Sequence, residues 1–250
     1  MQQEQSNKKQ GWRQYRLSKN GKIVVIVFSL TFLLTVVFQL IKSKTYSAHE
    51  FGFSIIKSEV DFNNNGRDDY KDFVRGAHKA ATSQTVETDS EDHSFSEIKE
   101  TAIDHCTNVI WRAFKEAGYS LQQMVEADIR ANLPVYAAAT EIGSADSNYR
   151  RVQILRVFFD RYAQTLSNIP TNDLGQFQPG DIIVYGSRFD HIGIVSDKRS
   201  KEGIPYLIHD LNQKTLEEDV LLETGAITRH YRFNAKLIAE DKLIAFEIEE

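Results

Sequence analysis

The stretch DHCTNVIWRAFKEAG, residues 104–118, is the part of the sequence from which the fold prediction starts. Its apolar residues at positions 109, 110, 113, 114 and 117 follow the spacing of one helical face, and Gly118 is a natural stop. Cys106, the single cysteine of the chain, stands at the first turn of this helix. The helix dipole and the unsatisfied N–H groups there favour a thiolate. The plainer interpretation is a small buried residue at a helix start.

Length and composition limit the classes of function. The 250 residues are enough for one sizeable domain with appendages. A formal net charge of −5 and the absence of long basic runs argue against a nucleic-acid partner. One cysteine allows no internal disulfide.

The N-terminal region predicts a membrane anchor. Residues 23–41 (IVVIVFSLTFLLTVVFQLI) carry no charge, and as a helix they reach about 28 Å, close to the hydrocarbon thickness of a bilayer. Six basic residues lie between positions 8 and 22, whereas only Lys42 and Lys44 follow closely. The positive-inside rule then predicts a single-pass protein of the cell membrane, with a cytoplasmic N-terminus and an extracytoplasmic domain. The alternative is a cleaved signal peptide, although the apolar run is longer than usual for one.

These features divide the chain into five predicted parts. They are a cytoplasmic basic tail (1–22), the transmembrane anchor (23–41), a juxtamembrane segment (42–60), a calcium-type loop with its helix (61–82), and the main domain (83–250).

The calcium-type loop is the twelve-residue segment DFNNNGRDDYKD, residues 61–72. Its predicted ligands stand at loop positions 1, 3, 5, 7, 9 and 12, and they are Asp61, Asn63, Asn65, Arg67 through its backbone carbonyl, Asp69 and Asp72. Gly66 occupies the sharp-turn position. The small number of carboxylates predicts weak binding of structural Ca²⁺, in the range of extracellular modules. The alternative is a solvated turn rich in Asn and Gly.

The rest of the chain predicts an α+β domain in which helices come first and antiparallel strands follow. Helical patterns cover residues 70–82, 106–117, 121–131 and 149–166, and strand patterns cover 182–185, 190–197, 204–210, 228–233 and 243–248. Residues 83–103 are polar and are expected to form a loop. Such an order of elements favours helices packed on an antiparallel sheet.

Two histidines later in the chain make Cys106 a candidate catalytic nucleophile. His191 begins one predicted strand and His209 ends the next, so a hairpin would make them cross-strand neighbours. A cysteine nucleophile needs a base, and the base needs a polar group to orient it. Asp210 is the alternative orienting group. A zinc site is the alternative to catalysis, with ligands drawn from Asp104, His105, Cys106, His191 and His209.

Several short segments resemble a known bacterial family. They are CTNVIWRAF (106–114), YRRV (149–152), QPGDII (178–183), HIGIVSD (191–197), PYLIH (205–209) and ITRHYR (227–232). Together they resemble the uncharacterised DUF1287 family, which is similar to the NlpC-type, papain-like cell-wall cysteine peptidases. The resemblance implies a papain-like α+β fold with Cys106 as nucleophile, His191 as base and His209 as orienting residue. It also implies peptidoglycan peptides as the substrate.

Three hypotheses follow. The first is a membrane-anchored, extracytoplasmic cysteine hydrolase, an amidase or peptidase that cleaves peptidoglycan stem peptides and needs no catalytic cofactor. The second is a non-catalytic, calcium-stabilised module that binds the cell wall or acts as a scaffold. The third is a lipid acyltransferase that uses the same residues. The hydrolase requires a reactive and indispensable Cys106, whereas the module tolerates its replacement.

Overall fold

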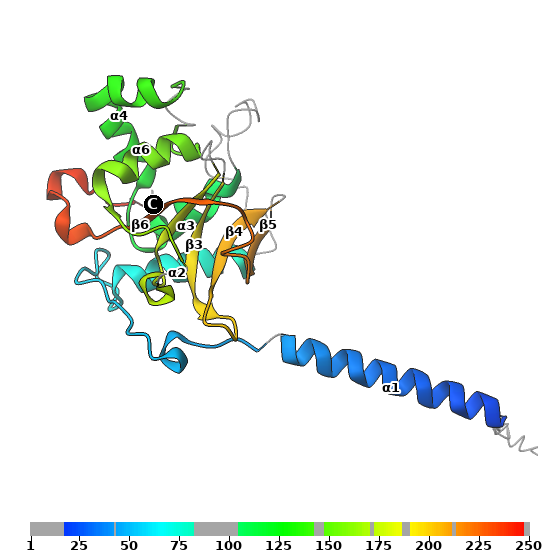
Figure 1. Cartoon of the computed structure of the whole chain (residues 1–250). Coiled ribbons are helices and arrows are strands. Elements are labelled where there is room, and N and C mark those ends of the chain that lie inside the picture. Colours follow the sequence, from blue (N-terminus) through cyan, green and yellow to red (C-terminus); the bar gives the residue numbers. More distant parts are fainter. Residues whose placement is uncertain are drawn as a thin grey trace, which may run out of the picture. The chain divides into compact units, whose positions relative to one another are not determined.

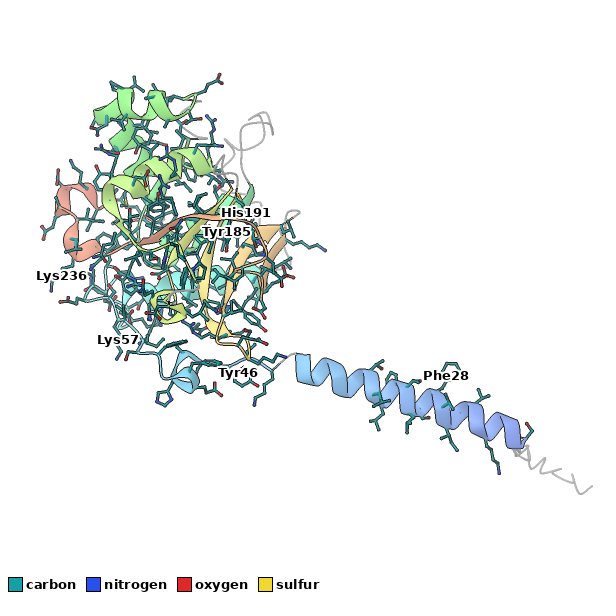
Figure 2. All side chains as sticks on the ribbon, in the orientation of Figure 1. Phe28, Tyr46, Lys57, Tyr185, His191 and Lys236 are labelled. Carbon is teal, nitrogen blue, oxygen red and sulfur yellow. The ribbon has the colours of Figure 1, made fainter. Side chains whose placement is uncertain are left out.

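The computed structural model describes residues 18–42, 44–82, 105–142, 148–170, 173–186, 191–211 and 214–247. The chain divides into two compact units, Met1–Lys44 and Thr45–Glu250. The first contains helix α1 (Lys19–Lys42), whose described apolar side chains, such as that of Phe28, are exposed (Figure 2). Within the described ranges, no helix combines the length and the apolar character needed to cross a membrane. The anchor expected at residues 23–41 is therefore not confirmed.

The second unit is an α+β domain with one antiparallel sheet, which confirms the coarse fold prediction (Figure 1). Its six strands lie in the order β1-β6-β2-β3-β4-β5. Their bounds are β1 Gln164–Thr165, β2 Ile182–Tyr185, β3 His191–Arg199, β4 Pro205–Leu211, β5 Lys214–Glu218 and β6 Ile227–Arg232. The α-helices within the described residues of this unit are α2 Asp69–Thr82, α3 Asn108–Glu116, α4 Leu121–Ala139 and α6 Val152–Tyr162. The 3₁₀ segments are η1 Ala48–Phe51, η4 His105–Thr107, η5 Leu174–Gln176, η6 Ala235–Leu237 and η7 Glu240–Lys242.

The sheet separates two apolar clusters because successive side chains of a strand point to opposite faces. Ile192, Ile194 and Ile208 belong to the larger cluster, which also contains the apolar faces of α2, α3, α4 and α6. Tyr185 and Leu207 belong to the smaller cluster on the other face. Helices α2 and α3 contact β3 and β4. The start of α3 is therefore held against the central strands.

Helices α2 and α3 pack unusually closely. A Cβ atom at Gly76 of α2 would lie 2.5 Å from the carbonyl oxygen of Arg112 on α3. Gly118, with φ +89°, ends α3 in the left-handed conformation that favours glycine. A Cβ atom there would lie 2.7 Å from the side chain of Asn63. These two glycines allow the loop at residues 61–68 and α2 to pack tightly against α3.

Helices α4 and α6 are joined through a buried carboxylate. Asp128 on α4 accepts hydrogen bonds from Tyr136 (2.6 Å), from Tyr162 on α6 (2.6 Å) and from Arg161 Nε (2.7 Å). Burial opposes ionisation of Asp128, but these hydrogen bonds outweigh it and lower its pKa. The ionised carboxylate therefore stabilises the contact between the two helices.

Several predicted element bounds need correction. Helix α6 ends at Tyr162, because the chain then extends into β1, which pairs with β6. Helix α4 continues to Ala139 through a kink at Asn132, two residues before Pro134. Strand β5 was not predicted, since KTLEE is mostly polar. No strand forms at the described residues 243–247, where Ala245 makes only an isolated bridge to Tyr119. The loop at residues 83–103 lies outside the described ranges.

Candidate functional site

The two predicted histidines are in direct contact. Strands β3 and β4 form an antiparallel hairpin in which Gly193 pairs with His209. His191, two residues before Gly193, points to the same face of the sheet. Its Nε2 lies 2.9 Å from His209 Nδ1, and the two rings are nearly perpendicular at 89°. One imidazole donates this hydrogen bond and the other accepts it.

Glu218 extends the pair into a row of three polar side chains. His209 Nε2 lies 3.4 Å from Glu218 Oε2 on the neighbouring strand β5. His209 is almost fully buried, with 3% of its surface exposed, so its ring has little room to turn. His191 lies beside Tyr185, with 6.0 Å between the ring centroids (Figure 2). The row holds the imidazole of His191 in one orientation.

Asp210, the alternative orienting group, lies on the other face of β4. Its Oδ1 accepts a short hydrogen bond from the hydroxyl of Thr215, its partner on β5. Of the two candidates, His209 is the one in contact with His191. Glu218 was missed in the sequence because a single glutamate on an unpredicted polar strand carries no pattern of its own.

Cys106 lies in η4, two residues before Asn108, the first residue of α3. The predicted place of the cysteine next to the first turn of this helix is confirmed, although the helix begins at residue 108 and not at 106. The η4 segment contacts both β3 and β4. Cys106 is buried, with 8% of its surface exposed, and belongs to the larger apolar cluster with Ile192 and Ile208. Strand alternation directs these isoleucines away from the face that carries the two histidines. The structure thus joins the two imidazoles directly, and it places Cys106 against the opposite face of the same two strands.

The described members of the predicted zinc set are not brought together as three metal ligands. Asp104 and the side chain of His105 lie outside the described parts of the structure. Among the described residues, Cys106, His191 and His209 do not form a cluster of three converging ligands. The facing nitrogens of the two histidines already share a hydrogen bond.

Two basic residues lie near the start of α3 and at the end of α4. Arg150 Nη1 donates to Asn108 Oδ1 (3.2 Å), and its Nε donates to the hydroxyl of Tyr149 (2.9 Å). Arg151 instead binds Thr140 Oγ1 (3.1 Å) and the carbonyl of Glu141. Arg150 therefore links the segment before α6 to the turn that carries Cys106.

The predicted calcium loop has a tightly organised first half. Asp61 accepts hydrogen bonds from the backbone N–H groups of Asn65 (3.0 Å) and Gly66 (2.7 Å). Asn63 Oδ1 also accepts from Asn65 N (3.1 Å). Gly66 has φ +86°, as a glycine at the sharp turn requires. Asp61, Asn63 and Asn65 thus present their side chains around one turn.

The second half of the loop meets this turn through Asp72. Asn65 Nδ2 lies 2.6 Å from Asp72 Oδ2, and Arg67 Nε lies 2.7 Å from Asp72 Oδ1. Asp72 is 1% exposed, so the guanidinium of Arg67 neutralises a buried charge. The arrangement brings four of the predicted side-chain ligands together, and a cation there would take the place of Arg67.

Asp69 points elsewhere. Its Oδ2 accepts from the hydroxyl of Tyr119 (2.6 Å) and its Oδ1 from the N–H of Phe62 (2.9 Å). Burial raises the pKa of Asp69 to about 6. The structure therefore gives Asp69 a role in fixing the loop to the segment after α3.

A buried ion-pair network connects β2 and β6 near the turn that precedes β2. Asp181 accepts from Arg232 Nε (2.7 Å) and Nη2 (2.7 Å), and it lies 2.8 Å from His230 Nε2. His230 is fully buried, donates from Nδ1 to the carbonyl of Ser167 (2.8 Å) and stacks on Phe177. The PGD and HYR segments of the sequence meet here, and their role in the structure is to fasten the sheet.

One known family matches the part of the chain that carries the histidine pair and the Asp181 network. The family described as "Domain of unknown function (DUF1287)" matches residues 79–233, well over half of the chain. The chain belongs to the DUF1287 family. The DUF1287 region includes Cys106, both histidines and the Asp181 network, whereas the loop at residues 61–72 precedes it.

One curated relative is "Uncharacterized protein YijF" of Escherichia coli (strain K12). The two sequences are 34% identical over 138 residues, which cover 52% of this chain and 64% of that protein. The chain thus matches less than two thirds of the length of this relative. No solved structure matches the DUF1287 chain.

Proposed function

We propose that this protein is a cysteine hydrolase that cleaves an amide bond, with Cys106 as nucleophile, His191 as base and His209 as the residue that orients the base. The contact between His191 Nε2 and His209 Nδ1 is the observation that carries the proposal. Nucleophilic catalysis by a cysteine requires an oriented base within reach of the thiol, and the imidazole pair supplies the oriented base. Because Cys106 packs in the cluster on the opposite face of β3 and β4, the proposal requires His191, the first residue of β3, to reach the thiol around the end of that strand.

The reaction would proceed in two steps. Since Nε2 of His191 is engaged by His209, Nδ1 is the nitrogen that would take the proton from the Cys106 thiol. The thiolate attacks the amide carbonyl carbon, the C–N bond breaks, and the imidazolium of His191 protonates the leaving amine. Water then attacks the thioester, gives a proton to His191 and releases the acid and the thiolate.

The resemblance to papain-like cell-wall peptidases supports peptidoglycan stem peptides as the substrate class and an extracytoplasmic location. The α+β sheet with a cysteine at the start of a helix is compatible with that fold type. A lipid acyltransferase would use the same residues, with a different nucleophile in place of water in the second step.

Digestion of purified peptidoglycan tests the activity. The full-length protein is expected to release fragments with new amine and carboxyl termini, detected by liquid chromatography and mass spectrometry. Cys106→Ser and His191→Ala should abolish the release, whereas His49→Ala, an exposed histidine of η1, should leave it unchanged. Equal release by Cys106→Ser and wild type would refute the hydrolase.

One observation favours the non-catalytic module as the second candidate. Cys106 is 8% exposed and packs with apolar side chains, as a structural cysteine does. In that case Cys106→Ser would retain the binding of the protein to peptidoglycan sacculi in a sedimentation assay, and no fragments would be released.

The loop at residues 61–72 supports a bound calcium ion in either candidate. The carboxylates of Asp61 and Asp72, the side chains of Asn63 and Asn65, and the carbonyl of Arg67 provide the oxygen ligands that Ca²⁺ prefers. The ion would fix α2 and the segment before it, and it takes no part in the reaction. Calorimetric titration with CaCl₂ should give heat that Asp61→Asn removes and that MgCl₂ does not reproduce.

A further inference from the structure

A second group of converging side chains lies on the helix-covered face of the sheet. His78 of α2 stands between Asp197 at the end of β3 and Glu217 of β5. His78 Nε2 is 3.2 Å from Asp197 Oδ1, and His78 Nδ1 is 3.6 Å from Glu217 Oε2. One ligand atom from each residue lies within 4.8 Å of the other two. Helix α2, far from β3 and β5 in sequence, thus places the imidazole of His78 between two carboxylates, which contact its two different ring nitrogens. A single ion would bind only one of these nitrogens, together with one oxygen of each carboxylate.

These residue types and distances suit a transition-metal ion. Imidazole nitrogen and carboxylate oxygen both bind Zn²⁺ at about 2.0–2.2 Å, so two ligands of a tetrahedral site lie about 3.4 Å apart. The distance between His78 Nε2 and Asp197 Oδ1, 3.2 Å, is already close to this value, whereas Glu217 Oε2 lies beside Nδ1 and would move toward an ion bound at Nε2. The side chain of Asp197 is 60% exposed, so a fourth ligand could come from solvent.

Glu217 is held ready by its neighbours. Its side chain is only 13% exposed, and the buried hydroxyl of Ser196 donates a short hydrogen bond to Oε1. This bond turns Oε2 toward His78, as outer hydrogen bonds orient the carboxylates of metal sites. Lys198 Nζ lies 2.5 Å from the same Oε2, so the carboxylate of Glu217 already attracts one cationic group, the ammonium of Lys198.

Charge also favours a divalent ion over the lysine. Two carboxylates and one ammonium leave the group with a formal charge of −1 when His78 is neutral. Lys198 is 44% exposed on a flexible side chain, so its ammonium can move to solvent when an ion arrives. A divalent ion would then replace the singly charged ammonium of Lys198 beside Glu217.

We propose that His78, Asp197 and Glu217 form a binding site for a divalent transition-metal ion of the Zn²⁺ type. The site is separate from the histidine pair, because Glu217 points to the helix-covered face of β5 whereas its neighbour Glu218, which contacts His209, points to the other face. It also differs from the loop at residues 61–72 in its ligands, because it contains an imidazole nitrogen whereas the loop offers only oxygen atoms. The ion would tie α2 to both β3 and β5 and does not depend on the proposed hydrolase.

Titration of the full-length protein with Co²⁺, followed by competition with Zn²⁺, tests the site. Wild type is expected to bind one Co²⁺ with a visible absorption of a nitrogen and oxygen site. His78→Ala and Glu217→Gln should each weaken the Kd by more than about tenfold, because loss of an outer partner alone has that effect. Lys198→Gln should tighten it, since the competing ammonium is gone. His49→Ala serves as the matched histidine control.

Two results would overturn the proposal. One is a Kd for His78→Ala equal to that of wild type. The other is a sulfur-to-cobalt absorption band that disappears in Cys106→Ser, which would locate the ion at the cysteine. Circular dichroism and the urea midpoint, measured without metal, show whether each variant is folded. If His78→Ala does not fold, Lys198→Gln still tests the site. Co²⁺ binding by Lys198→Gln that is equal to or weaker than that of wild type would also count against the proposal.

Discussion

Replacing Asp181 by Asn is expected to destabilise the protein strongly without touching the proposed catalytic residues. Asp181 is 1% exposed and accepts hydrogen bonds from Nε and Nη2 of Arg232, from His230 and from the N–H of Gln178 (2.8 Å). Asparagine keeps one acceptor oxygen and turns an NH₂ group toward donors. The guanidinium of Arg232 then lies buried without a counter-charge.

The magnitude follows from this loss. Removal of one partner of a buried ion pair costs about 3–5 kcal/mol, and since the Arg232 side chain retains 10% exposure, we take about 3 kcal/mol. For a domain of this size, 1 kcal/mol changes Tm by about 2–4 °C, so Asp181→Asn should lower Tm by about 6–12 °C. The same change should lower the urea midpoint with no change in the slope of the transition.

Heat and urea denaturation, followed by circular dichroism and by Trp111 fluorescence, measure both quantities. Asp241→Asn is the matched control, because Asp241 forms an ion pair with Lys242 at an exposed site. Its midpoint should equal that of wild type. Arg232→Gln should be destabilising alone and add little to Asp181→Asn, since both remove the same interaction. An Asp181→Asn protein as stable as wild type would refute the structural role of this network.

Three further outcomes are expected. Wild type should be more stable than Asp128→Asn at every pH above about 3.9, the pKa of an aspartate in the unfolded chain. This difference in stability should disappear as the pH falls through the lower pKa of Asp128 in the folded protein, and acid titration of the two proteins measures it. Gly76→Ala should cost about 1–3 kcal/mol in urea denaturation, because the new methyl group meets the backbone of Arg112 and the helices must separate; an unchanged midpoint would contradict the close packing. Glu218→Gln should slow alkylation of Cys106 by no more than about fivefold, because its contact to His209 is half exposed; a loss as large as that of His209→Ala would contradict this ranking.

The sequence predicted the parts of the fold in which local pattern and packing agree. The amphipathic helix after Cys106 and the apolar runs of β2, β3 and β4 have the periodicities that the core requires. The hairpin then followed from two strands joined by a short polar turn. Because the start of one strand of a hairpin lies beside the end of the next, the proximity of His191 and His209 could be predicted, and the register shift between Val195 and Arg199 does not remove it.

What the sequence did not predict depends on tertiary contacts. The edge strand β5 has three charged residues among five, so only its pairing with β4 identifies it. Asp69 matched a calcium-ligand position by spacing, but the nearby hydroxyl of Tyr119 draws its carboxylate inward. The His78 cluster could not be predicted, because His78 lies more than 100 residues before Asp197 and Glu217 and the three share no motif. In each case the deciding partner comes from a distant part of the chain.

The measurement that tests the central claim most directly is the pH dependence of Cys106 alkylation by iodoacetamide, with wild type and His191→Ala compared side by side. The account predicts rapid reaction of wild type at pH 6. It predicts that His191→Ala follows an ordinary thiol, with a pKa of about 8.5, while His49→Ala behaves as wild type. Identical profiles for wild type and His191→Ala would contradict a Cys106–His191 pair and leave the non-catalytic module as the function.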